Sequence, residues 1–261
     1  MWRWIWIIFI STLVHSNHID RYLSFIKSYY LGAPGSHIDG EIQIVLDPQQ
    51  IAEIEQLARA RLSEKGHSPE EVLEFSQVGI IAEDQYWIWV RDAVIFPSGF
   101  KGTYNRILWR SHLDGPPAAV IIPIFADGRI AVIVNYRHAT RSWQLQLPAG
   151  LRKPGETPEV AARRELKEET GCDAKSLEYL GSLAPDSGVS SSLVPVYLAH
   201  IEMTQLPQSG QSEAIEKMLL LTAKELREAV SAGEISVTIN GQTKKIPCND
   251  ATLAYALQHL R

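Results

Sequence analysis

The chain has 261 residues, of which 45% are hydrophobic and 21% charged, and this composition is typical of a globular protein with one large or two modest cores. Its net charge of -5 at pH 7 supplies no basic surface for a nucleic-acid backbone, so no nucleic-acid partner is expected. The 2 cysteines lack metal-ligand spacing, which argues against a disulfide framework and favours a reducing, cytoplasmic compartment.

The first stretch, MWRWIWIIFISTLV, is apolar and rich in tryptophan. It is shorter than the roughly 20 residues that cross a bilayer as a helix. Three interpretations stay open: a signal-peptide core, an interfacial anchor with its tryptophans among the lipid headgroups, and an N-terminal extension. We treat residues 1–35 as an extension, with membrane association as the alternative.

Residues 36–115 have the pattern of a separate N-terminal domain. Asp47 and Pro48 predict the start of a helix, and Ser68 with Glu71 forms a capping box for a second one. Two runs rich in aromatic and β-branched residues then flank a Pro-Ser-Gly turn. We therefore expect a domain of two helices and a small sheet.

Residues 116–261 predict a second domain of strands and helices. The Asp127-Gly128 turn between two apolar runs is a strong hairpin signal, and the strand WQLQLP follows. Towards the C-terminus, Thr222 caps a helix, Asn240-Gly241 predicts another hairpin, and Asp250 opens a helix expected to run through Leu260.

A helix is predicted from Pro158 to Thr170 in the middle of this second domain. Thr157 is a good N-cap, proline suits the first helical position, and Gly171 can adopt the left-handed conformation that ends a helix.

On this helix Glu165, Glu168 and Glu169 are three and four residues apart, so their carboxylates share one face. Like charges at this spacing repel by a few tenths of a kcal/mol per pair, and a cation would reverse that sign. Carboxylate oxygens suit Mg²⁺, which is usually shared with substrate phosphates. The competing interpretation is a solvated helix with surface ion pairs such as Arg164 to Glu168.

The segment resembles the Nudix box, G-x5-E-x7-R-E-U-x-E-E-x-G-U, in which U is apolar. Only the last position departs, where Cys172 replaces the usual aliphatic residue. The matching positions are Gly150, Glu156, Arg164, Glu165, Leu166, Glu168, Glu169 and Gly171.

The flanking motifs resemble the ADP-ribose pyrophosphatase branch of this family. They are VRDAVIFPSGFKGTYNRIL and VNYRHATRSWQLQLPAG before the box, and APDSGVS after it. The resemblance implies an α/β/α Nudix sandwich with an N-terminal β-rich domain, and a homodimer.

The resemblance also implies a set of site residues. It places Mg²⁺, with Mn²⁺ as an alternative, on Glu165, Glu169 and the carbonyl of Ala149. It places Glu168 and Arg164 in the catalytic cluster. A further glutamate is expected from a later loop, where Glu213 is the first candidate and Glu216 the second; whether Glu213 binds metal or acts as the base stays open.

Three arginines are candidates for binding substrate. Arg137 ends a strand beside the box, where a guanidinium can hold a diphosphate oxygen in bidentate fashion; a surface salt bridge is the alternative. Arg91 and Arg106 resemble positions of the N-terminal domain near the phosphates.

The implied function is Mg²⁺-dependent hydrolysis of a small-molecule nucleoside diphosphate derivative, with ADP-ribose cleaved to AMP and ribose 5-phosphate as the first choice. The alternatives within the family are another nucleotide sugar, a dinucleotide or a coenzyme A derivative. A non-catalytic module that binds ADP-ribose is the alternative outside enzymes.

Overall fold

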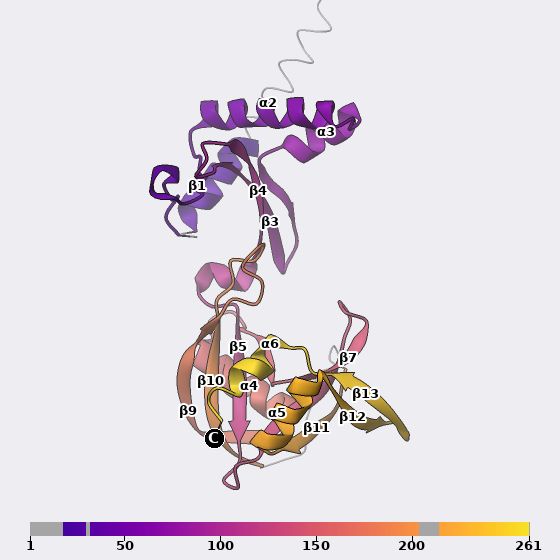
Figure 1. The fold of residues 1–261 in the computed structure, drawn as a ribbon. Coiled ribbons are helices and arrows are strands. Elements are labelled where there is room, and N and C mark those ends of the chain that lie inside the picture. Colours follow the sequence, from indigo (N-terminus) through magenta and orange to yellow (C-terminus); the bar gives the residue numbers. More distant parts are fainter. Residues whose placement is uncertain (1–17, 30–31, 204–213, 261) are drawn as a thin grey trace, which may run out of the picture. The chain divides into compact units, whose positions relative to one another are not determined.

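The computed structural model describes residues 18–29, 32–203 and 214–260, which form two compact units (Figure 1). The first extends to Asp114 and includes the segment Asp186–Ser192, and the second comprises Gly115–Pro185 and the chain from Leu193 onwards. The tryptophan-rich start and Glu213 lie outside the described residues. Within those residues, no helix is long and apolar enough to cross a membrane.

The first unit is a four-stranded antiparallel sheet packed against helices. Its central strand β3 pairs with β4 along its whole length and with β1 and β2 over shorter stretches. The chain is helical over residues 18–28 and then forms η1 (His37–Asp39), β1 (Gln43–Ile44), α2 (Pro48–Glu64), α3 (Pro69–Ser76), β2 (Gly79–Glu83), β3 (Trp87–Ile95), β4 (Lys101–Trp109) and η2 (Arg110–Asp114).

Local sequence signals set the helices of this unit where the sequence predicted them. The Asp47 carboxylate accepts the Gln50 N–H and starts α2, while Ser68 and Glu71 form the expected capping box of α3. The core between helices and sheet contains Tyr22, Ile51, Ile54, Ile88, Val90 and Leu108, all nearly inaccessible to solvent.

The segment Asp186–Ser192 lies in sequence between two strands of the second unit but packs in the first. The Ile107 N–H donates to the carbonyl of Val189 (2.8 Å), and the Tyr104 hydroxyl donates to that of Gly188 (2.9 Å). Ile107 and Ser190 also form a parallel bridge. The segment therefore extends the edge of β4.

The second unit is built on a seven-stranded sheet in which β11, β6, β5, β10 and β9 are neighbours in that order. Strand β7 pairs with β6, β8 pairs with β5, and only the β5–β10 pair is parallel. The elements are β5 (Ala118–Ile124), β6 (Ile130–Arg137), β7 (Ser142–Gln146), β8 (Ala149–Leu151), α4 (Pro158–Thr170), β9 (Cys172–Leu183), β10 (Val194–Met203), β11 (Ile215–Leu221), α5 (Ala223–Ala232), β12 (Glu234–Ile239), β13 (Gln242–Pro247) and α6 (Ala251–Ala256).

Helices cover both faces of this sheet. On one face, Ala162 and Leu166 of α4 pack against small and branched residues of the strands. On the other face, Leu226 of α5 and Leu253 of α6 pack in a larger apolar cluster. The predicted α/β/α sandwich with an N-terminal β-rich domain is thus confirmed (Figure 1).

The C-terminal helix is shorter than predicted. Its N-cap is Asp250 as expected, but α6 ends at Ala256 and not at Leu260. After Ala256 the backbone tightens, because the Gln258 and His259 N–H groups donate to carbonyls three residues earlier.

Candidate active site

The helix α4 begins and ends at the residues that the sequence predicts. The Thr157 hydroxyl accepts the Val160 N–H, Pro158 occupies the first turn, and Gly171 adopts φ 71° while donating its N–H to the Lys167 carbonyl. These local signals fix the two ends of the helix, and the packing of Leu166 against the sheet fixes its rotation.

The glutamates of α4 divide into buried and exposed members. Glu165 and Glu169 are only 5% and 3% exposed, whereas the Glu168 side chain is 41% exposed. A Glu169 oxygen accepts the backbone N–H of Ala149 at 3.0 Å, which ties the helix to the start of β8. Two buried carboxylates one turn apart therefore lie beside the backbone of Ala149.

Arg164 compensates the negative charge of this cluster. Its guanidinium donates to both carboxylate oxygens of Glu156 (2.8 and 3.0 Å), to Glu165 (2.5 Å) and to Glu168 (3.1 Å). The hydrogen bonds that Arg164 donates to Glu156 lower the pKa of Glu156 to about 2, and the same bonds raise the pKa of Arg164. Arg164 thus stays charged and holds the Glu165 carboxylate in place.

Gly150 leaves room for that carboxylate. A Cβ built on Gly150 would lie 2.0 Å from the carboxylate carbon of Glu165 and 2.2 and 2.4 Å from its oxygens. The backbone of Gly150 has no positive φ, so a close approach and not a special conformation requires glycine at this position.

The residues around Ala149 fit a hard divalent cation by their chemistry. Two buried carboxylates and a main-chain carbonyl are the oxygen ligands that such an ion prefers. Within the described part of the chain, no three side chains of the His, Cys, Asp and Glu types are gathered as a metal group. The expected additional ligand, Glu213, lies in the undescribed stretch 204–213, and Glu216 is exposed on β11.

A polar group on β6 and β7 lies on the same face of the sheet as α4. Alternate residues of a strand share a face, so Asn135 and Arg137 lie on the side of Ala131, which packs with Ala162 and Leu166 of α4. Strand pairing places Gln144 opposite Asn135 and Gln146 opposite Ile133, on that same face. All three amide side chains are buried, at 5–8% exposure.

Arg137 donates from Nε to the side-chain carbonyl of Gln146. The sequence predicted Arg137 at the end of a strand beside the box but not this partner. The signal was present in the alternation of WQLQLP, which puts both glutamines on one face of the strand.

The structure places Arg91 and Arg106 in the first unit, where protein partners hold both guanidinium groups. Arg91 is 5% exposed and donates to the carbonyls of Glu74 and Gln77, and burial lowers its pKa. Arg106 forms a two-point ion pair with the buried carboxylate of Asp92 (2.5 and 3.1 Å). Their binding of substrate stays a prediction.

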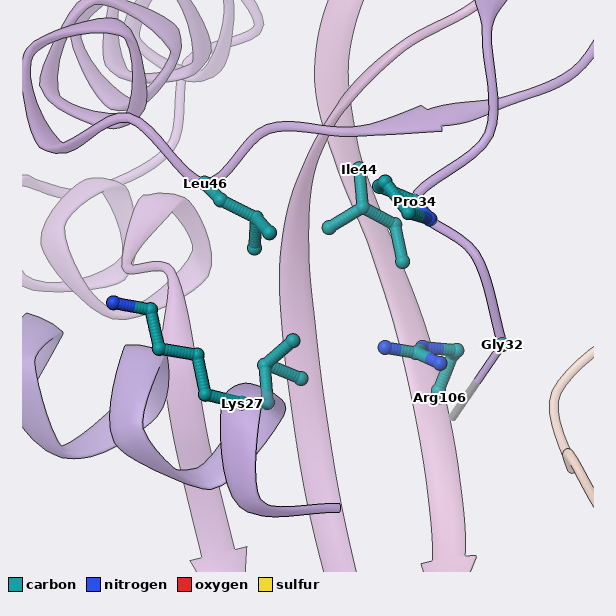
Figure 2. Close-up of a pocket in the computed structure, with 7 residues that line it drawn as sticks. Lys27, Gly32, Pro34, Ile44, Leu46 and Arg106 are labelled. Carbon is teal, nitrogen blue, oxygen red and sulfur yellow. The ribbon is translucent and has the colours of Figure 1, made fainter. Parts of the chain in front are cut away.

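Arg106 also lines a cavity of about 200 Å³ within the first unit. Figure 2 shows its side chain entering this space beside Pro34 and Ile44, with Leu46 opposite. Asp92, which holds the guanidinium, also accepts the Tyr22 hydroxyl at 2.7 Å, and burial raises the pKa of that tyrosine. The sequence carried no signal for this pairing of Tyr22 with Asp92, because 70 residues separate them.

Known proteins resemble this chain across both units. The chain is 26% identical over 202 residues to an ADP-ribose pyrophosphatase of Bacillus subtilis, covering 77% of this chain and 94% of the relative. It is 33% identical over 155 residues to an ADP-ribose pyrophosphatase of Mycobacterium tuberculosis, covering 58% and 72%. Among solved structures, an ADP compounds hydrolase matches with a TM-score of 0.52 and 24% identity, over 70% of this chain and 88% of that chain.

The NUDIX domain model matches residues 115–237, which contain the whole of α4 and its carboxylate cluster. The resemblance drawn from the box is therefore confirmed, and the chain belongs to the Nudix family of pyrophosphohydrolases.

Proposed function

We propose that the protein hydrolyses the diphosphate of a nucleoside diphosphate derivative, and that its substrate is ADP-ribose. The observation that carries this proposal is the pair of buried carboxylates, Glu165 and Glu169, held beside Ala149 and charge-balanced by Arg164. Arg164 carries one positive charge against the carboxylates of Glu156, Glu165 and Glu168, so the cluster keeps a net negative charge that a divalent cation would offset and that a protein that only binds nucleotide does not need. The names of the relatives from B. subtilis and M. tuberculosis support the choice of ADP-ribose.

Glu165, Glu169 and the carbonyl of Ala149 would hold the metal, with Mg²⁺ as the first choice and Mn²⁺ as the alternative. A bound divalent ion supplies a Lewis acid that neutralises charge on phosphoryl oxygens and lowers the pKa of water.

The side chains of the site would orient the metal ligand, accept the proton and bind the diphosphate. Arg164 holds the Glu165 carboxylate in the orientation of a metal ligand through their 2.5 Å hydrogen bond. The partly exposed Glu168 or Glu213 accepts the proton of the attacking water, and Arg137 binds a diphosphate oxygen. Water adds to phosphorus, so ADP-ribose and one water give AMP and ribose 5-phosphate.

A substrate panel tests this proposal. The purified protein is incubated with Mg²⁺ and ADP-ribose, another nucleotide sugar, a dinucleotide or a coenzyme A derivative, and the products are identified by ion-exchange chromatography. ADP-ribose should have the highest kcat/KM, and ¹⁸O from labelled water should appear in one monophosphate product. Binding of ADP-ribose without turnover would refute the hydrolase and favour the non-catalytic module.

The homodimer implied by the resemblance stays a prediction, which light scattering of the purified protein tests directly. An interfacial anchor at residues 1–14 is tested by mixing the full chain with lipid vesicles and measuring co-sedimentation.

A further inference from the structure

The side chain of Gln146 links Arg137 to the C-terminal helix. Its carbonyl oxygen accepts from Arg137 Nε, and its amide nitrogen donates to an Asp250 oxygen at 2.8 Å. Arginine can only donate and a carboxylate can only accept, so these two partners fix which end of the amide faces which neighbour. At 6% exposure, Gln146 is shielded from competing water.

Asp250 is itself anchored at the start of α6. Its other carboxylate oxygen accepts the N–H of Thr252 at 2.8 Å and the Thr252 hydroxyl at 2.6 Å. The helix behind it is packed through Leu253 and Ala256, which are inaccessible to solvent. A series of fixed contacts therefore runs from the packed helix through Asp250 and Gln146 to Arg137.

This linkage matters because Arg137 is an exposed side chain at the end of β6. A free arginine has about 2 kcal/mol of rotamer entropy, part of which is lost when it binds a ligand. The bond to Gln146 restrains the side chain at Nε. Within the described residues, the two terminal nitrogens have no protein acceptor, and these form the edge that binds a phosphate in bidentate fashion.

We infer that Gln146, anchored by Asp250, is a positioning residue that holds the Arg137 guanidinium ready for the substrate diphosphate. The inference rests on the proposed function and deepens it. An amide is required at residue 146, because a glutamate would accept from Arg137 but would meet the Asp250 carboxylate without a proton to donate.

The first experiment replaces Gln146 by leucine and follows steady-state kinetics with ADP-ribose and Mg²⁺. KM should rise about tenfold while kcat changes less than about threefold, because a restraint on a charged hydrogen-bonding group is lost without a change in the reacting groups. The matched control is Gln144→Leu. Gln144 is a buried amide on the same face whose partners are Thr140 and Ser142, and its replacement should leave KM unchanged.

Two further variants test whether Gln146 acts through Arg137. Adding Gln146→Leu to Arg137→Ala should produce no additional rise in KM, since the two residues form one unit. Gln146→Glu alone should impair binding, and Gln146→Glu combined with Asp250→Asn should restore it, because the donor and acceptor have then exchanged places.

A readout that needs no substrate separates this inference from the proposed function. The Arg137 Nε–H signal in ¹H–¹⁵N NMR spectra should be protected from exchange in the wild-type protein and in Gln144→Leu, and lost in Gln146→Leu. An unaltered signal and KM in Gln146→Leu would overturn the positioning role. If the signal depends on Gln146 but no nucleoside diphosphate compound is bound or hydrolysed, the proposed function fails and only the contact stands.

Discussion

Replacing Gly150 by alanine should slow catalysis strongly without unfolding the protein. The new Cβ would lie 2.0 Å from the carboxylate carbon of Glu165, whereas ordinary contacts begin at 3.4 Å. The carboxylate must therefore retreat by about 1.4 Å. Glu165 can move because it is a side chain, but at 5% exposure it has little space to do so.

A misplacement of about 1 Å in a catalytic group costs roughly 10²-fold in rate, so kcat should fall by about 10²- to 10³-fold. This corresponds to about 3–4 kcal/mol of activation free energy. Phosphate-monoester release from ADP-ribose at saturating Mg²⁺ measures kcat, and circular dichroism with thermal melting reports the fold.

Gly155→Ala, in the loop between β8 and α4, provides the matched control. Gly155 has φ 80° and no atom near its would-be Cβ, so the substitution should cost about 1 kcal/mol of stability and leave kcat unchanged. If Gly150→Ala keeps the wild-type kcat and Mg²⁺ requirement, the Glu165 carboxylate is not needed where the structure places it, and the argument for the metal site fails.

The remaining predictions concern the other carboxylates. Glu169→Gln should keep the fold by circular dichroism and lower turnover by about 10²-fold or more, since one charge is removed beside the phosphates; near-normal turnover would contradict its role. If Glu213 binds metal, Glu213→Gln should raise the Mg²⁺ concentration needed for half-maximal rate. If Glu213 is the general base, the variant should lose the acidic limb of the pH–rate profile, and excess Mg²⁺ should not restore its activity. The pKa of Glu156 falls from 4.5 to about 2 in the folded state, so its bond to Arg164 stabilises the fold above pH 4.5 and is lost as the pH falls towards 2. Glu156→Gln should therefore lower the free energy of unfolding by about 1–3 kcal/mol at pH 7 and have little effect near pH 2, as measured by urea denaturation at both pH values.

The sequence predicted features whose determinants are close together in the chain. The ends of α4 depend on Thr157, Pro158 and Gly171, so the helix was predicted residue for residue. The Asp127-Gly128 hairpin is local in the same way. The box spacing likewise identified the carboxylates, because helix geometry alone puts them on one face.

Features that depend on distant residues escaped prediction. Gln146 meets Asp250 across 104 positions, and no periodicity in either segment indicates the other. The premature end of α6 depends on tight turns after Ala256, in a stretch whose composition also suits a helix. The packing of Asp186–Ser192 in the first unit is a tertiary contact, and the composition of this segment does not indicate it.

The membership of Asp186–Ser192 in the first unit has a consequence for biosynthesis. The ribosome completes the strands of that unit by Trp109, but the acceptor for the Ile107 N–H is Val189, about eighty positions later. The edge of β4 therefore emerges with unpaired backbone groups and stays available to other chains until about half of the second unit has been made. Truncation before residue 186 would leave the edge of β4 unpaired, so a fragment ending at Asp114 should aggregate in size-exclusion chromatography. The same fragment mixed with a peptide of residues 186–192 should stay monomeric.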